Sequence, residues 1–335
     1  MKRQNGFVLV ATLWILATIT IAAAYFAQRI ANSIELAQQY DQHIKSRIAC
    51  SDSKSEITYL MSTRNFSLFG LGDVNTHFSL DNRPYKMEGD CIARLQDTRG
   101  LYPINGISRE ALGILLTERK VPVAAYDQLY DTLMDYIAPN PQLHRLNGVT
   151  LQDYQNAGLP KPFGRPLITP DQLRNVYGWS AQKSLWEGDT PFTDSITTAL
   201  NVGMNPNTAP ISVLMTLPGI TLPGAELIVK YRAIELIQGE TQLAQLAGLD
   251  PQKLVLKILA LPSDTTRVSL GTSSQATSIR YNIKLTPDAS EAPWRIDYYY
   301  SISQRITQKN DDAIPSNPFE LEKAPPPPAK AALNF

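Results

Sequence analysis

Few side chains in this 335-residue chain are of types that do chemistry, and their spacing fits none of the common catalytic or metal-site patterns. The two cysteines cannot support a zinc ribbon, and His43, His77 and His144 are too widely separated for metal-hydrolase motifs. The sequence also lacks the GxxxxGK[ST], GxGxxG, HExxH and GxSxG patterns of nucleotide-binding and hydrolytic enzymes. We therefore expect a protein that is not an enzyme.

The composition narrows the class of protein further. The 31 Lys and Arg residues balance 31 Asp and Glu residues, so the chain as a whole is not marked as a binder of nucleic acid or anionic lipid. Hydrophobic residues make up 43% and charged residues 19%, which argues against a disordered regulator or a coiled-coil rod. The length and composition therefore favour a folded protein of one or two domains.

The N-terminal 27 residues predict a membrane anchor. Residues 1–6 form a short basic leader, and the uncharged run Phe7–Ala27 has 21 residues, or about 30 Å of helix, enough to cross a bilayer. Lys2 and Arg3 predict a cytoplasmic N-terminus, with the rest of the chain across the membrane. A secretory signal cleaved near the alanine triplet at 22–24 and a simple signal anchor remain as alternatives.

The anchor is expected to continue into one long helix over residues 7–61. No Gly or Pro occurs between Gly6 and Gly70, so nothing in this stretch breaks a helix. After the uncharged run, apolar residues recur every three or four positions, which predicts one packing face along the helix: Ile30, Ile34, Ala37, Tyr40, Ile44 and Ile48.

The rest of the chain predicts an α+β fold in which an all-α domain interrupts an antiparallel sheet. Short helix-like segments and 15 of the 24 prolines lie between Pro103 and Pro262, so we assign residues 105–262 to one compact helical insertion. Strand-like segments on both sides, within 62–104 and 263–308, are expected to share the sheet. Alternating apolar and polar residues predict a half-buried strand over Ser278–Leu285, and the Pro-rich tail 309–335 is expected to be disordered.

The two cysteines are expected to form a disulfide. Cys50 and Cys91 lie outside the cytoplasm if the N-terminus stays inside, and an oxidising compartment favours a bond between them. The bond would join the end of the long helix to an early strand. Closing a loop of about 40 residues is worth roughly 3–4 kcal/mol in the chain-entropy model.

The N-terminal segment resembles the class III signal of type IV pilins and pseudopilins, because a basic leader ends in Gly and is followed by Phe and a hydrophobic helix. The resemblance implies that a prepilin peptidase cuts after Gly6 and methylates Phe7. The family usually carries Glu at the fifth mature position, where this chain has Ala11. In pilins that acid is thought to pair with the subunit above, so its absence fits a subunit at the filament tip.

Three further segments resemble the protein K family of minor pseudopilins in type II secretion systems, in which a large α-domain is inserted in a pilin fold. They are Leu101–Asn105, Arg165–Gly178 and Asn205–Leu214, and the missing Glu at Ala11 is typical of that family. The third segment departs from the family pattern: Gly203 and Met204 look inserted and Pro206 replaces Val. The resemblance implies a non-enzymatic subunit of the cell inner membrane with a single-pass anchor and a periplasmic C-terminal domain.

The same resemblance implies a set of partners. The chain would cap the tip of a periplasmic pseudopilus and prime its assembly, together with minor pseudopilins I and J, with H joining the complex. The prepilin peptidase and the inner-membrane assembly platform would act on it. Its tip would contact the secretin or secreted cargo, and no nucleic-acid partner is expected.

Calcium is the cofactor hypothesis, because relatives in the protein K family can bind this hard cation through carboxylates and carbonyls. Asp189 and Asp194 are the candidate ligands here. The alternative is that both are solvated turn residues.

The main competing motif is the segment Asn207–Arg232, which resembles a helix-hairpin-helix of DNA-binding proteins. A membrane-anchored DNA receptor would need clustered basic charge, yet residues 105–262 carry 12 Lys and Arg against 14 Asp and Glu. A hairpin that only packs two short helices is favoured. A minor pilin of a type IV pilus shares the leader and remains a further alternative.

Overall fold

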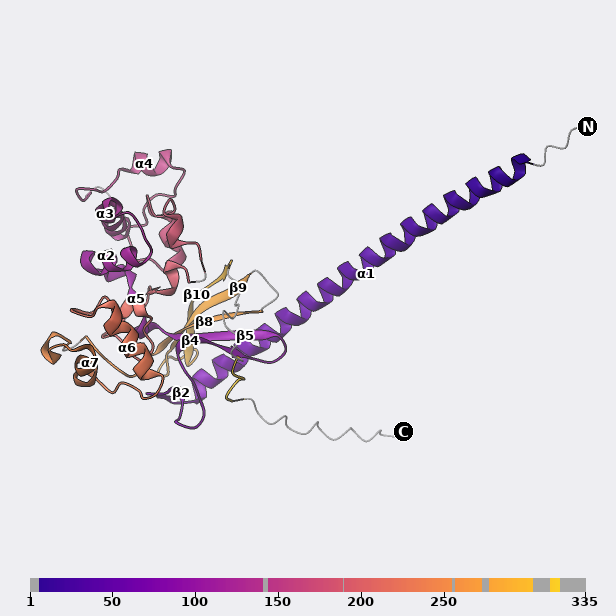
Figure 1. Cartoon of the computed structure of the whole chain (residues 1–335). Helices are drawn as coiled ribbons and strands as arrows, with labels where there is room; N and C mark the ends of the chain where they lie inside the picture. Colours follow the sequence, from indigo (N-terminus) through magenta and orange to yellow (C-terminus); the bar gives the residue numbers. More distant parts are fainter. Residues whose placement is uncertain are drawn as a thin grey trace, which may run out of the picture.

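The computed structural model describes residues 6–140, 144–188, 190–254, 257–272, 277–303 and 314–319. It shows an α+β protein in which one long helix, α1 (Gly6–Thr63), projects from a head of sheet and short helices (Figure 1). The head divides into the sheet, which lies on the end of α1, and the inserted helical segments beyond the sheet. The predicted fold class is therefore confirmed.

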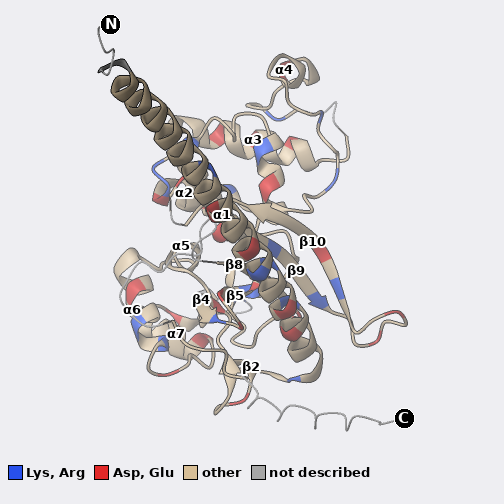
Figure 2. Cartoon of the chain, turned by 90° about the vertical axis from the view of Figure 1, so that its right-hand side faces the viewer, with Lys and Arg blue, Asp and Glu red and all other residues tan. Residues whose placement is uncertain are grey.

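Helix α1 has 58 residues and ends two residues later than predicted. Its first part, up to residue 28, is uncharged, as the tan ribbon at the start of α1 in Figure 2 shows, and its large apolar side chains from Val8 on are exposed. The threonines of this part donate their hydroxyl hydrogens to carbonyl oxygens three or four residues earlier, as Thr12 does to Leu9 at 2.8 Å and Thr20 to Leu16 at 2.8 Å. These bonds satisfy the hydroxyls within the helix, so the run stays compatible with hydrocarbon.

A five-stranded antiparallel sheet forms the centre of the head, in the order β10-β9-β8-β5-β4. The early strands lie beside the late ones because β5 pairs with β8 along its whole length. Three short strands after α1 form a separate small sheet. The strands are β1 (Phe66–Ser67), β2 (Gly70–Gly72), β3 (His77–Phe78), β4 (Asp81–Lys86), β5 (Cys91–Asp97), β8 (Thr265–Thr272), β9 (Ser278–Leu285) and β10 (Trp294–Ile302).

The end of α1 covers one face of this sheet. Ile57 and Met61 are almost fully buried there and pack in one hydrophobic core with Val268 and Tyr281 from β8 and β9. The first α1 residue that is buried, among those described, is Ser46. Only the last third of α1 therefore belongs to the head.

The opposite face of the sheet is polar but is also buried, which corrects the half-buried strand predicted at Ser278–Leu285. All eight residues of β8 are buried, and on β9 the polar residues Ser278, Arg280 and Asn282 are buried as well. Arg267 faces Asn282, and Ser269 faces Arg280, across the two strands. The alternation is real, but the polar set faces the inserted segments instead of water.

The insertion differs from the prediction of one compact all-α domain in two respects. It contains two hydrophobic cores, one within residues 104–196 and one within 204–258. It also contains a strand, β7 (Ile196–Thr197), which pairs in parallel with β6 (Tyr102–Pro103). Its helices are α2 (Arg109–Glu118), α3 (Tyr126–Ile137), α4 (Leu151–Asn156), α5 (Ile211–Leu214), α6 (Leu222–Arg232) and α7 (Glu240–Ala247), with 3-10 turns η1 (Thr98–Gly100), η2 (Ile104–Gly106), η3 (Val123–Ala125), η4 (Pro170–Asn175), η5 (Lys183–Leu185), η6 (Phe192–Asp194) and η7 (Pro251–Leu254).

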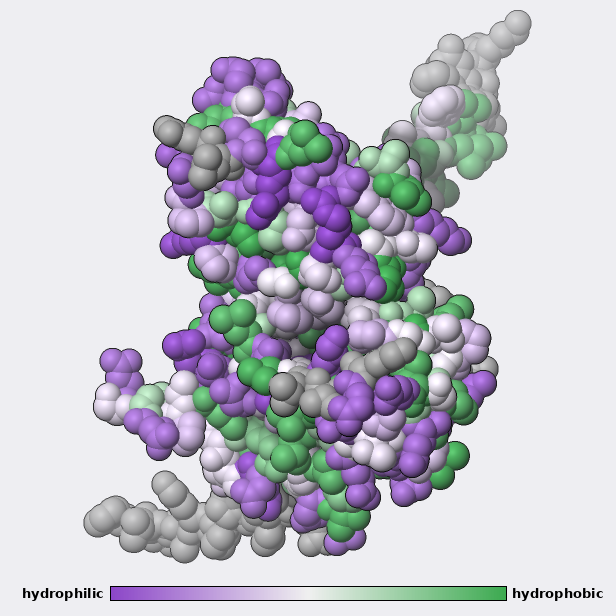
Figure 3. Space-filling view, turned by 90° about the vertical axis from the view of Figure 1, so that its left-hand side faces the viewer, coloured by the Kyte–Doolittle hydropathy of each residue, from purple (hydrophilic) through white to green (hydrophobic). Residues whose placement is uncertain are grey.

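The two cores appear as two lobes when the insertion is viewed from the side (Figure 3). The upper lobe, which carries α2, α3 and α4, has a mainly hydrophilic surface, whereas apolar surface gathers on the lower lobe. Helix α7 ends at Gly248, which adopts the left-handed conformation that favours glycine.

Part of the C-terminal tail is ordered, so the prediction of disorder for 309–335 is wrong for residues 314–319. Ser316 forms a parallel bridge with Lys86 at the edge of β4, and the Asn317 amide nitrogen donates to the Lys86 carbonyl at 2.9 Å. The ring of Phe319 packs on Phe78 with centroids 5.5 Å apart. The rest of the tail lies outside the described residues.

Candidate assembly interface

The predicted processing site lies at the start of α1. Gly6 is the first residue of the helix, Phe7 follows it, and residues 1–5 lie outside the described part of the chain. Ala11 lies in the first turns of α1 among exposed apolar side chains such as Val8, Leu9 and Val10. By length and composition, α1 is the one helix among the described residues that could cross a membrane; a signal sequence has the same properties.

Beyond the uncharged run, α1 keeps an exposed apolar stripe. We use "the α1 stripe" for Ile30, Ile34, Ala37, Tyr40, Ile44 and Ile48, whose large members are all more than half exposed. The head does not cover this stripe, since the contacts of α1 with the sheet begin at Ser46 on another side of the helix. An exposed apolar face of this length marks a surface for helix packing.

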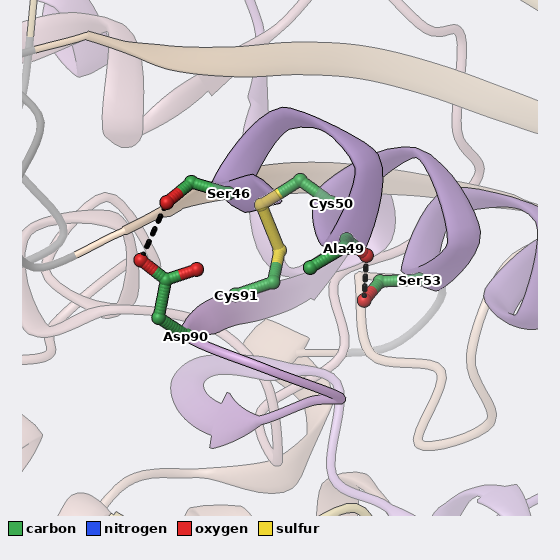
Figure 4. Close-up of a disulfide and its surroundings, with 6 residues drawn as sticks. All are labelled: Ser46, Ala49, Cys50, Ser53, Asp90 and Cys91. Carbon is green, nitrogen blue, oxygen red and sulfur yellow. Dashed lines mark hydrogen bonds between the residues drawn. A yellow bond between two sulfur atoms is a disulfide. The ribbon is translucent and has the colours of Figure 1, made fainter. Parts of the chain in front are cut away.

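The predicted cysteine pair is bonded in the structure. Cys50 on α1 and Cys91 at the start of β5 form a disulfide with Cα atoms 5.2 Å apart (Figure 4). Next to it, the Ser46 hydroxyl donates to a carboxylate oxygen of Asp90 at 2.7 Å. Both contacts hold the beginning of the packed part of α1 on the same end of the sheet.

The structure places Asp194 in a buried ionic cluster behind the sheet. Its carboxylate lies 2.7 Å from the Arg280 guanidinium, and Arg267 donates to the carbonyl oxygens of Thr193, Asp194 and Ile196. Burial opposes ionisation of Asp194, but the charges of Arg280 and Arg267 outweigh it and lower its pKa.

The metal hypothesis for this region stays a prediction. Asp189 lies outside the described residues, so the structure does not show the predicted pair together. Among the residues that are described, no group of three or more His, Cys, Asp and Glu side chains could hold a metal ion. Asp194 faces arginines, which is the electrostatic surrounding of an ion pair.

A second buried carboxylate, Asp97, is hydrogen-bonded at both places where the chain passes between the sheet and the insertion. Asp97 is fully buried, and its Oδ1 accepts from the backbone nitrogen of Arg99 at 3.0 Å and from the nitrogen and hydroxyl of Ser263 at 2.9 and 2.8 Å. Its Oδ2 accepts from the Asn205 amide at 2.9 Å and the Thr208 hydroxyl at 3.1 Å. Five donors from four residues thus converge on this one carboxylate.

Asparagines in two of the segments that carried the family resemblance hold distant parts of the insertion together by hydrogen bonds. The Asn105 side chain accepts from the backbone nitrogen of Leu167 at 2.7 Å and donates to its carbonyl at 3.0 Å, so the first two segments are bonded to each other. Asn207 makes the same pair of bonds with Ile237, at 2.9 and 2.8 Å. An asparagine side chain that accepts from a backbone N–H and donates to the carbonyl of the same residue makes the pair of hydrogen bonds that a neighbouring β-strand would make.

The hairpin that resembles a DNA-binding motif packs into the second core of the insertion. Helices α5 and α6 are joined by a turn in which Gly219 has φ +84°, and Val213, Leu214 and Ile228 are fully buried. The Arg232 guanidinium is directed inward and donates to the carbonyl oxygens of Pro206 at 2.7 Å and Ala209 at 2.5 Å. The guanidinium of this arginine therefore satisfies backbone carbonyls within the hairpin segment and is not directed outward toward a phosphate.

Sequence reasoning singled out Asp194 only as a metal ligand, and it missed the arginines around Asp194, the residues of the Asp97 cluster and one exposed apolar surface. The signal for the first cluster was the alternation of arginines with apolar residues on β8 and β9, which carry Arg267 and Arg280. The apolar surface consists of Leu200, Val202, Leu259 and Leu261, brought together where Met204 pairs with Ile258. No periodic pattern marks it, because its residues come from two irregular segments.

Comparison with known proteins identifies the fold. No protein-family model matches this sequence, and no curated protein does either. Among solved structures, the fold is similar to a chain in the crystal structure of the GspK-GspI-GspJ complex from the type 2 secretion system of enterotoxigenic Escherichia coli, with a TM-score of 0.53 and 14% sequence identity. The similarity covers 79% of this chain and 97% of that chain. The chain thus shares with a subunit of that complex an α+β fold with a long N-terminal apolar helix, an antiparallel sheet and inserted helical segments.

Proposed function

We propose that this protein is a minor pseudopilin of a type II secretion system that caps the tip of the periplasmic pseudopilus and primes its assembly. The observation that carries the proposal is the similarity of this fold to a chain from the GspK-GspI-GspJ complex, which covers 79% of this chain and 97% of that chain. A filament subunit needs an anchor that can leave the membrane and pack beside others, and the exposed α1 supports that role.

The tip position is supported by two features of the chain. Ala11 replaces the acid that would pair with a subunit above, and the two-lobed insertion widens the head on the side of the sheet away from α1 (Figure 1). In this proposal Gly6 directs cleavage by the prepilin peptidase, and α1 holds the subunit in the inner membrane with its head in the periplasm. Pseudopilins I and J are the direct partners, with H joining them.

The proposal is tested by reconstitution from purified ectodomains. A chain that starts at Ser33 keeps every α1 residue buried against the sheet, since the first of them is Ser46. We expect this ectodomain, mixed with those of pseudopilins I and J from the same source, to elute as one species. Light scattering after size exclusion should give the mass of a 1:1:1 complex.

The proposed function is refuted if this ectodomain stays monomeric in the presence of folded ectodomains of pseudopilins I and J. The matched control is the same ectodomain with Ile44→Asp and Ile48→Asp, which places two charges on the α1 stripe without touching a buried residue. We expect this variant to be folded and to lose the complex. If no complex forms with either protein, labelled duplex DNA is the next ligand to try.

A further inference from the structure

A pocket of about 460 Å³ lies between α1 and the sheet, at the end of the head nearest the membrane anchor. One wall is α1 from His43 to Lys54, and the other is formed by β8, β9 and β10, including Ser301 and Tyr299. The Cys50–Cys91 disulfide holds the two walls together, since Cys50 lines the pocket. The pocket is therefore a fixed feature of the head.

The described residues that line this pocket include basic and hydroxyl side chains and no acid. His43, Arg47 and Lys54 come from α1, and serine hydroxyls come from both walls. The Lys54 ammonium lies 4.8 Å from the centre of the Tyr299 ring and 5.6 Å from that of Tyr281, which orients it by cation–π attraction. Positive charge beside hydroxyl groups is the chemistry that receives a carboxylate or another small anion.

These cations have no acidic partner among the residues that the structure describes. Arg47 and Lys54 form no ion pair there, whereas Lys45, on the same helix, pairs with Asp41 at 2.7 Å. At the rim, the Ser46 hydroxyl donates to a carboxylate oxygen of Asp90 at 2.7 Å. Lys54 is half-buried, so a partner anion would meet a charge that water screens only in part.

A lipid headgroup cannot be that anion. His43 lies 16 residues after Ala27, the last residue of the uncharged run. This separation corresponds to about 24 Å along a helix. The headgroup region extends only about 5–8 Å beyond the hydrocarbon on each side. The pocket thus opens well above the membrane surface.

The pocket is adjacent to the α1 stripe. Ile44 and Arg47 are three residues apart on the helix, as are Ile48 and Ser51, so the stripe and the pocket rim are neighbouring faces of α1. A partner helix that covers the stripe passes beside the opening of the pocket. Its side chains are within reach of Arg47 and Lys54.

We propose that this pocket is a receptor for an acidic side chain, Asp or Glu, of the helix that packs on the α1 stripe. The inference rests on the proposed function, because that function supplies the neighbouring helix. The apolar stripe gives the contact its area, and the acid fixes the register and rotation of the partner along α1. Electrostatic contacts at the edge of an interface act in this way more than they add affinity.

The test uses the full chain in detergent micelles, titrated with the complex of full-length pseudopilins I and J at low and high salt. The variant Arg47→Gln, Lys54→Gln removes both charges, and Lys45→Gln is the matched control on the same helix outside the pocket. We expect the double variant to bind about tenfold more weakly at low salt, with most of the difference lost at high salt. The control should stay within about twofold of the wild type.

Two further variants separate charge from folding. Arg47→Gln alone changes an exposed side chain, so it must keep the wild-type melting curve and lose part of the affinity. Arg47→Glu must bind more weakly than Arg47→Gln, because it repels the acid. Equal affinity of the wild type, the double variant and Arg47→Glu, in a complex that forms normally, overturns the receptor but leaves the proposed function intact. If no complex forms, both are overturned.

Discussion

Replacing Asp194 by Asn should destabilise the head by about 3 kcal/mol. The carboxylate is 10% exposed and Arg280 is 3% exposed, with 2.7 Å between them, so the pair is buried. Removing one partner of a buried pair leaves the other charge without compensation, which typically costs 3–5 kcal/mol. We expect the lower end of that range, because Arg280 keeps its bond to the Ser269 hydroxyl at 3.1 Å.

The assay is urea denaturation of the oxidised ectodomain from Ser33, followed by tryptophan fluorescence, to which the fully buried Trp179 contributes together with Trp186 and Trp294. The matched control is Asp171→Asn, which breaks an exposed pair with Arg174 of similar length, 2.9 Å, and should change the free energy of unfolding by less than about 1 kcal/mol. The double variant Asp194→Leu, Arg280→Met should be more stable than Asp194→Asn, because it leaves no unpaired charge between these positions.

The pH dependence has a definite sign. The pKa of Asp194 is lowered from 3.8 in the folded state, so its contribution is complete above that value and is lost as the pH falls through the folded pKa. Asp194→Asn lacks the contribution at every pH, so the difference from the wild type should shrink in acid. A difference below about 1 kcal/mol at pH 7, or one that does not fall in acid, refutes the ionic account.

Three more outcomes follow from the same contacts. Reducing the Cys50–Cys91 bond, which spans 41 residues, should lower the free energy of unfolding by about 4 kcal/mol in the chain-entropy model, and equal urea midpoints with and without dithiothreitol would contradict it. Asp97→Ala leaves five donors without their acceptor and should cost at least about 3 kcal/mol by thermal melting; a loss under 1 would mean that water replaces the carboxylate. Phe319→Ala should cost about 1–2 kcal/mol, since its ring is only partly buried on Phe78, and an unchanged midpoint would show that the tail segment is not docked in solution.

Local patterns predicted the elements well where periodicity is long or sharp. The helix over 7–61 rests on 63 residues without Gly or Pro, and strand β9 begins and ends where alternation predicted, at Ser278 and Leu285. The expectation that early and late strands share one sheet came from counting strands, and the pairing of β5 with β8 agrees with it.

The sequence did not predict whether each face of a strand is exposed to water or buried. Alternation shows that Arg280 and Ile279 point to opposite sides of β9, but it cannot tell a solvated polar face from a buried one. That depends on whether another element supplies partners, and here Asp194 comes from η6, 86 residues earlier. The two cores of the insertion were missed for a similar reason, since periodicity within short helices does not say which helices share a core.

Asp97 limits how the insertion can move. The chain leaves the sheet at Asp97 and returns to it near Ser263, so the backbone connects the insertion to the sheet at two places, an arrangement that elsewhere permits hinge motion. Here one buried carboxylate bonds the outgoing Arg99, the returning Ser263 and, through Asn205 and Thr208, the insertion itself. Gly100 adds a steric limit, because a Cβ at that position would lie 2.5 Å from the Thr208 hydroxyl. An insertion that swung freely could be pushed aside by an incoming subunit. One fixed at both connections would block the position above it, as the proposed tip subunit must.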